Sequence, residues 1–164
     1  MRPSTLAEPV TPAFLALRQQ HRDVDVRATV RAALGAGEDA GLAVRQSERD
    51  QVRLFVTRSA AGDARRVVAV HRRAGVDSSV GEVSLAAGDG PVTLTVSARG
   101  QDYALLAADG DETPVTVAVV DGRTLDSVAT GGFLGLWVGV FATSNGRPSA
   151  TMVQVEQLEY VPVL

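Results

Sequence analysis

Short runs in which apolar and polar residues alternate recur along most of this chain. Residues 24–31 (VDVRATVR) and 91–99 (PVTLTVSAR) show the pattern most clearly, since every second side chain is Val, Leu or Ala. Successive side chains of a β-strand point to opposite faces, so such a run predicts a strand with one buried face. About eleven runs of this kind, divided by Gly, Asp and Asn turn residues, predict an all-β, two-sheet antiparallel β-sandwich.

The pattern gives little support for helices or for a second domain. Residues 30–43 are rich in Ala and Leu, but Gly35 and Gly37 interrupt them, which favours a loop or at most one helical turn. Three prolines mark residues 1–12 as an extended N-terminal lead-in, and neither a repeat nor a linker divides the rest. We therefore predict a single β-sandwich domain at residues 13–164.

One stretch, residues 131–146 (GGFLGLWVGVFATSNG), departs from the usual alternation. Its even positions from 134 to 142 are aliphatic or Ala, whereas its odd positions include Phe133, Trp137 and Phe141, with glycine between them. Two interpretations stay open. Either the chain itself buries the aromatic face, under a long loop or in a second small core, or the face is a surface that another domain or a sugar covers.

Composition narrows the classes of function. A chain of 164 residues can form one domain with a substantial core, and a net charge of −3 predicts neither a nucleic-acid nor a membrane partner. The absence of Cys excludes disulfides and thiolate metal sites. The first ten residues lack the apolar region of a secretory signal, and the longest apolar run is too short to span a membrane, so we expect a soluble, cytoplasmic protein.

Motifs of the common catalytic classes are missing from the sequence. Two histidines, His21 and His71, cannot form a histidine-rich metal site, and neither a serine-hydrolase elbow nor a phosphate-binding glycine loop is present. The acidic stretches 37–41 (GEDAG) and 109–112 (DGDE) fit turns better than calcium loops, because no distal bidentate Glu follows. We expect no catalytic residue, no metal site and no cofactor in this chain.

Long polar side chains within strand-like runs mark a second candidate surface. They are Arg18, Gln20, Arg45 and Gln46. These residues can form a polar sheet face that contacts carbohydrate, or they can simply be exposed to solvent, and the pattern leaves both options open.

Five stretches, in the same order, resemble the C-terminal β-sandwich domain of glycoside hydrolase family 43 β-xylosidases and α-arabinofuranosidases. They are PAFLALRQQHRD (12–23), EDAGLAVRQSERDQVRL (38–54), PVTLTVSARGQDYALL (91–106), DGRTLDSVATGGFLGLWVGVFATSNG (121–146) and VEQLEYVPV (155–163). The resemblance implies a concanavalin A-like jelly roll. It also implies that the catalytic Asp and Glu residues belong to a separate five-bladed β-propeller, whose motifs are absent here.

By this resemblance the chain is not an enzyme on its own but a non-catalytic accessory domain of a xylan 1,4-β-xylosidase-like glycosidase. Phe133 takes the position of the aromatic residue that narrows the substrate pocket, and Trp137 and Phe141 share its interface with the propeller. The partners implied are the propeller, xylo-oligosaccharide and a second copy of the chain. The alternative is a stand-alone, lectin-like carbohydrate-binding module that uses the four polar residues. An independent hydrolase is a third function, and for it we expect no turnover of aryl xylosides.

Overall fold

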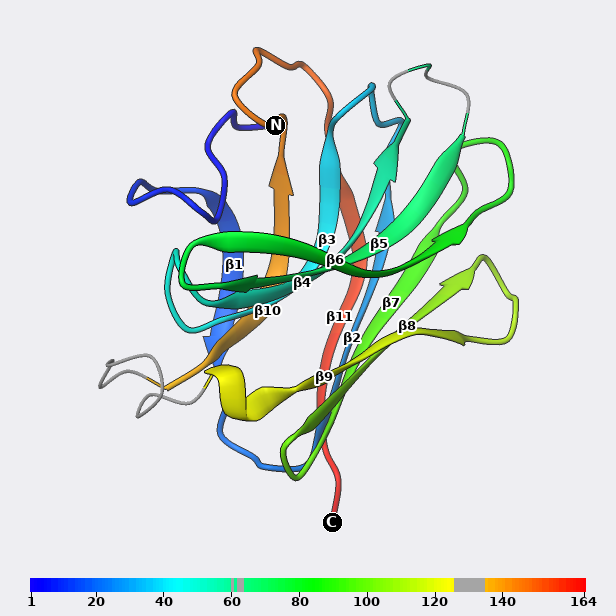
Figure 1. Cartoon of the computed structure of the whole chain (residues 1–164). Coiled ribbons are helices and arrows are strands. Elements are labelled where there is room, and N and C mark those ends of the chain that lie inside the picture. The colour runs from blue at the N-terminus through cyan, green and yellow to red at the C-terminus, as the bar shows by residue number, and fades with distance from the viewer. Residues whose placement is uncertain (60, 62–63, 126–134) are drawn as a thin grey trace.

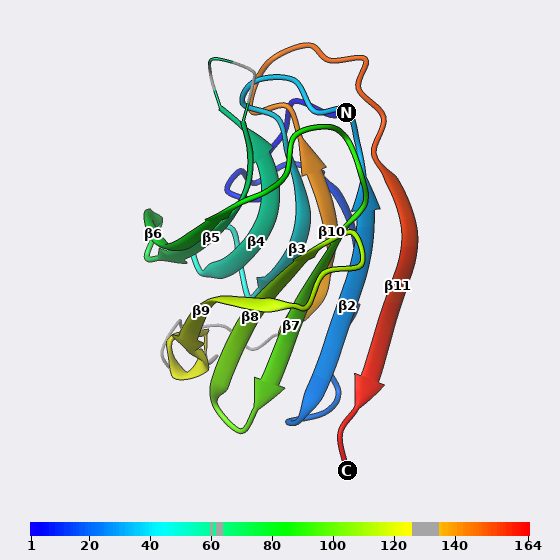
Figure 2. The same ribbon diagram turned by 90° about the vertical axis from the view of Figure 1, so that its right-hand side faces the viewer.

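The computed structural model shows two antiparallel β-sheets packed face to face, which confirms the predicted all-β sandwich (Figure 1, Figure 2). The structure describes residues 1–59, 61, 64–125 and 135–164. Within these residues no helix has the length and hydropathy needed to cross a membrane. Residues 32–38, for which the sequence predicted a loop or at most one helical turn, contain no helix.

The two sheets differ in size, and each has two edge strands. Sheet A has the order β1 (Ala13–Arg18), β10 (Trp137–Thr143), β3 (Asp39–Arg45), β4 (Gln51–Arg58), β5 (Arg65–Arg73), β6 (Val76–Ser84). Sheet B has the order β11 (Gln154–Pro162), β2 (Val24–Arg31), β7 (Val92–Arg99), β8 (Asp102–Asp109), β9 (Val115–Asp121). A 3-10 turn, η1 (Gly122–Leu125), follows β9.

The main core lies between the sheets and uses the alternation that the sequence displays. In β2 and β7 every second residue is buried, as the patterns of 24–31 and 91–99 predicted. Leu42, Leu54, Leu94 and Leu105 have no exposed surface, and the first two come from sheet A and the others from sheet B. Burying each such side chain contributes about 1.5–3 kcal/mol, so this interleaved layer is the main source of stability.

The DGDE stretch forms a turn between β8 and β9, as expected. Gly110 adopts a left-handed φ of 56°, which glycine tolerates without strain. The Asp109 carboxylate accepts hydrogen bonds from the backbone N–H of Ala86 at 2.7 Å and from Arg65 at 3.2 Å. The Arg65 side chain is only 3% exposed. Since Asp109 belongs to sheet B and Arg65 to sheet A, this buried contact links the two sheets.

The centre of sheet A depends on a glycine whose neighbours leave no room for a side chain. A Cβ at Gly41 in β3 would lie 2.1 Å from the Leu54 carbonyl oxygen and 2.5 Å from the Phe55 Cα atom, both in β4. Those are backbone atoms of a paired strand, so they cannot rotate away. The close approach of β3 and β4 at this point therefore requires glycine at position 41.

We predict that Gly41→Ala lowers the free energy of unfolding by about 1–3 kcal/mol, because the added methyl group forces β3 and β4 apart. Gly90→Ala is the matched control, since a Cβ there meets nothing within 4 Å. Urea unfolding at neutral pH measures both variants. Equal stabilities would show that the strands yield without cost.

Candidate interaction surface on the outer face of sheet A

The outer face of sheet A, which points away from sheet B, carries a row of long polar side chains and one tryptophan. Cα pairing aligns these residues across all six strands at one level of the sheet. We name this set the polar row, and it comprises Arg18, Trp137, Arg45, Gln51, Arg72 and Asp77. Trp137 and Phe141 lie on the same face with Gly139 between them, as the alternation predicted.

Trp137 and Arg18 form the part of the polar row that lies toward the sheet edge. The Arg18 guanidinium carbon is 5.3 Å from the centre of the indole ring, within the range of a cation–π contact. Arg18 is exposed and Trp137 is half-buried, so a flat aromatic and guanidinium surface faces outward. Phe133, the predicted pocket-closing residue, lies outside the described residues.

The middle of the polar row is covered by the N-terminal segment, residues 1–12. The Leu6 carbonyl oxygen accepts hydrogen bonds from Gln51 Nε2 at 3.0 Å and from Arg45 Nε at 3.3 Å. Gln51 is fully buried, and burial lowers the pKa of the Arg45 guanidinium, with Glu48 opposing that effect. The side chains of Arg45 and Gln51 therefore donate hydrogen bonds to the chain's own backbone.

Hydrogen bonds to the connection between β10 and β11 hold the N-terminal segment in place. The Met1 ammonium group donates to the Thr151 carbonyl oxygen at 2.6 Å. The Arg2 carbonyl oxygen accepts from the Ser144 N–H at 3.0 Å. Since the first residues of the segment are tied by these bonds and its last residue continues into β1, Leu6 is held against the outer face.

Phe141 corrects one sequence-based expectation, because it does not lie on an exposed surface. It is 5% exposed and contacts Leu6, Phe55 and Val68 in a second small core on the outer face of sheet A. Its ring meets that of Phe55 edge-on, with centres 6.0 Å apart and planes at 72°. The interpretation of a second small core is therefore the right one for Phe141, and the chain itself supplies the cover.

The four polar residues named from the sequence do not form one surface. Arg18 and Arg45 flank Trp137 in the polar row. Gln20 lies beyond β1, where its backbone N–H donates to the Tyr160 hydroxyl of β11 at 2.9 Å. Gln46 is 9% exposed in the turn after β3, where its N–H donates to the Asp50 carbonyl oxygen.

Three residues that the sequence analysis missed complete the far end of the outer face. The Asp77 carboxylate lies 2.8 Å from a guanidinium nitrogen of Arg53 and 3.0 Å from one of Arg72. Burial acts to raise the pKa of Asp77, but attraction and hydrogen bonds from the two arginines outweigh it and lower the pKa. The available signal was the run Val52, Leu54 and Val56 in β4, whose inward direction places Arg53 on the opposite face.

We predict that Leu6→Ala lowers the free energy of unfolding by about 2–5 kcal/mol, because it empties the centre of the second small core. Val119→Ala is the control, since Val119 is 62% exposed on β9, and its cost should stay within about 0.5 kcal/mol. Chemical denaturation compares the two. A loss at Leu6 no larger than that at Val119 would mean that residues 1–12 are not part of the folded unit.

A second prediction concerns Asp39, at the start of β3. Burial raises the pKa of this carboxyl, although Asn145 Nδ2 donates to it at 2.8 Å. A raised pKa makes the native state less stable as pH rises above about 4, whereas the lowered pKa of Asp77 has the opposite effect. As the pH rises from 3 to 7, the stability of Asp39→Asn relative to the unsubstituted chain should therefore increase. The relative stability of Asp77→Asn should decrease.

Denaturant unfolding at both pH values measures this contrast. The two substitutions are chemically identical, so they share any general effect of removing a negative charge. A relative stability that changes in the same direction for both variants would contradict the prediction.

Solved structures of glycoside hydrolase family 43 proteins share this fold. The xylan β-1,4-xylosidase from Bacillus halodurans C-125 has a TM-score of 0.88 at 17% identity, over 98% of this chain and 31% of its own. The BlXynB protein from Bacillus licheniformis has a TM-score of 0.88 at 16% identity, over 99% of this chain and 32% of its own. Protein GH43B of a Bacteroides ovatus xyloglucan PUL has a TM-score of 0.86 at 20% identity, over 93% of this chain and 30% of its own.

This chain thus spans less than a third of the length of each of these three proteins. The family model for the β-xylosidase C-terminal concanavalin A-like domain matches residues 1–161, which include the N-terminal segment, the described strands as far as Val161, and the polar row. The resemblance found in the sequence is confirmed: this chain belongs to the family of β-xylosidase C-terminal concanavalin A-like domains.

Proposed function

We propose that this chain is a non-catalytic accessory domain of a β-xylosidase-like glycoside hydrolase, and that it packs on a separate catalytic β-propeller. The observation that carries the proposal is the family match over residues 1–161, to a domain that forms the C-terminal part of larger enzymes. In this proposal the chemistry belongs to the propeller. The sandwich supplies a contact surface and helps to close the substrate pocket.

The contact with the propeller lies at the start of β10 in this proposal. Trp137 offers a half-buried ring, and Arg18 stacks on it from the neighbouring strand. Covering such apolar surface contributes about 25 cal/mol per Å², and a guanidinium stacked on a ring keeps its polar edge free for hydrogen bonds. Phe133, four residues earlier in the sequence, is the proposed pocket-closing residue.

The second candidate, a stand-alone carbohydrate-binding module, has weaker support. Arg45 and Gln51 already bind the Leu6 carbonyl oxygen, so a sugar would have to displace the N-terminal segment to reach them. Gln20 lies beyond the end of β1 and Gln46 in the turn after β3, so neither belongs to the polar row. A sugar would be left with Arg18 and Trp137, which is a small platform for carbohydrate stacking.

The experiment expresses this chain together with the catalytic β-propeller of a family 43 β-xylosidase. We expect a one-to-one complex with greater β-xylosidase activity than the propeller alone. Trp137→Ala should weaken the complex at least tenfold, and Phe133→Ala should raise KM with little effect on assembly. Val76→Ala is the control, because Val76 is 67% exposed on β6, the far edge of sheet A.

Isothermal titration of the isolated chain with xylotriose separates the two candidates. The accessory role predicts no heat of binding at millimolar sugar and no turnover of aryl xylosides. Saturable binding by the isolated chain, together with a propeller that is fully active alone, would favour the binding module instead.

A further inference from the structure

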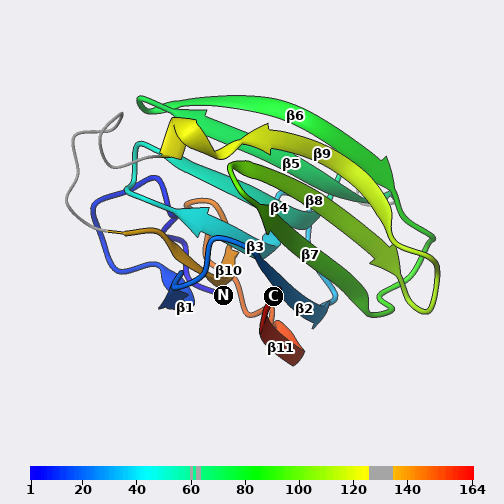
Figure 3. The ribbon, with the colours of Figure 1, turned by 90° about the horizontal axis from the view of Figure 1, so that it is seen from below.

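Strand β1 is an edge of sheet A, and no other strand of the described residues pairs with its outer side. Among the described strands β1 pairs only with β10. It lies at the margin of the molecule when this is seen from below (Figure 3). An edge strand presents a row of N–H and C=O groups that can pair with a further chain.

Two contacts establish which backbone groups of β1 point outward. The Gln19 N–H donates to the Leu136 carbonyl oxygen at 2.8 Å, and the Leu15 carbonyl oxygen points at Gly139 of β10. Odd-numbered residues of β1 therefore direct their backbone groups toward β10. Since these groups alternate along a strand, the N–H and C=O groups of Phe14, Ala16 and Arg18 point away from the sheet.

The other three edge strands each contain a bulge, whereas β1 contains none. The register shifts leave Val80 unpaired in β6, Val117 in β9 and Glu156 in β11. Bulges twist an edge and block pairing with another chain. The six residues of β1, AFLALR, pair with β10 in unbroken register and include neither an acidic residue nor a proline.

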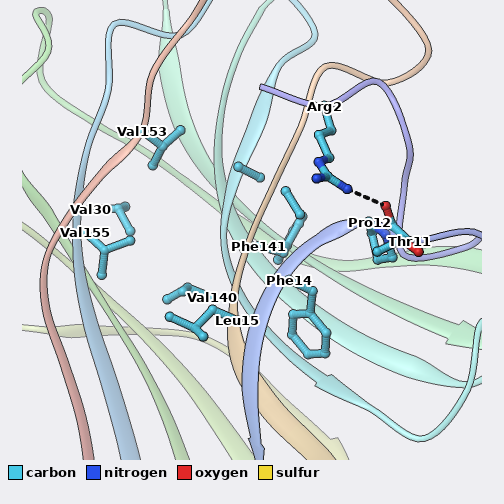
Figure 4. A pocket seen from close by; sticks show the side chains of 12 residues that line it. Arg2, Thr11, Pro12, Phe14, Leu15, Val30, Val140, Phe141, Val153 and Val155 are labelled. Atoms are coloured by element: carbon cyan, nitrogen blue, oxygen red, sulfur yellow. Dashed lines mark hydrogen bonds between the residues drawn. The ribbon is translucent and has the colours of Figure 1, made fainter.

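An apolar groove of about 480 Å³ opens beside β1, between the two sheets. Leu15 and Val140 from sheet A face Val30 and Val155 from sheet B across it (Figure 4). Leu15 is 69% exposed and Leu17 is 38% exposed. The sandwich is closed at the opposite edge, where Gly81 of β6 lies against the Val117 carbonyl oxygen of β9.

We propose that two copies of this chain pair through β1, antiparallel across a two-fold axis, so that sheet A continues from one copy into the other. This inference does not depend on the accessory role. With Ala16 opposite Ala16 of the second copy, Phe14 stands opposite Arg18, and every outward N–H and C=O of these three residues finds a partner. In the neighbouring register, centred on Leu15, Arg18 would face Pro12, which has no N–H to donate.

The same register accounts for the two exposed leucines of β1. For this reason we propose a second copy of the chain as the partner of this edge. Leu15 of one copy stands opposite Leu17 of the other, on the face that borders the groove. Each copy therefore covers the exposed leucines of its neighbour. Directly opposed apolar side chains of this kind stabilise antiparallel strand pairs.

Sedimentation velocity of the full chain at concentrations up to 100 µM tests the proposal. We expect a dimer of 34.2 kDa, twice the chain mass of 17.1 kDa. Leu15→Lys should give the 17.1 kDa monomer, because it places two like charges at the interface. Val76→Lys is the matched control on the far edge strand β6, where Val76 is 67% exposed, and it should remain dimeric.

Ala16→Pro tests the backbone contact directly, because it removes an outward N–H without affecting the pairing with β10. It should also give a monomer, with unchanged circular dichroism and a Tm close to that of the unsubstituted chain. A monomeric unsubstituted chain at 100 µM would overturn the proposal. So would a dimer that survives both Leu15→Lys and Ala16→Pro.

A cysteine pair reports the register, since the chain has no cysteine of its own. Under mild oxidation Ala16→Cys should form a disulfide-linked dimer, because the two copies of residue 16 face each other across the axis. Leu15→Cys is the control and should link much more slowly. Preferential linking of Leu15→Cys would overturn the register proposed here.

Discussion

The central strands of sheet A have to be covered on both faces, and much of the molecule follows from that constraint. In β2 of sheet B buried and less buried residues alternate, whereas nearly every residue of β3 and β4 is buried. One face of these strands packs on sheet B, and the other bears Phe55 and, from β10, Phe141. The N-terminal segment places Leu6 over these rings. Its backbone carbonyl is buried with it, and a buried carbonyl needs donors, which Arg45 and Gln51 provide.

This constraint also limits where the sandwich can meet a partner. Arg45 and Gln51 donate hydrogen bonds to the Leu6 carbonyl oxygen, and Arg72 forms an ion pair with Asp77. The polar row thus has one end whose side chains face outward, at Arg18 and Trp137. A stacked guanidinium and indole suit a protein contact that joins apolar area to polar hydrogen bonding, and both residue types are common at the centres of protein interfaces. That is the physical basis for placing the propeller contact there.

The sequence predicted the fold and the direction of side chains better than it predicted burial. Alternation identified β2 and β7 and placed Trp137 and Phe141 on one face, because strand geometry is local. It left open whether Phe141 was covered, since the cover is Leu6, which is distant in sequence and came from a segment without strand pattern. The prediction that Gln46 lies on a polar sheet face was wrong for a related reason. Gln46 follows Arg45 in sequence but lies in a turn, where alternation no longer determines the direction of a side chain. The resemblance identified the family, which periodicity alone could not.

The two surfaces proposed for association meet at Arg18 without competing. Its side chain leaves the outer face toward Trp137, whereas its backbone groups lie in the plane of the sheet and point outward from the edge. Strand pairing uses the second direction and a propeller contact uses the first. A two-fold axis perpendicular to the sheet keeps the outer faces of both copies on the same side. A dimer formed through β1 would therefore present two Trp137 surfaces side by side, so the groove at the open edge and the aromatic surface can be covered in one assembly.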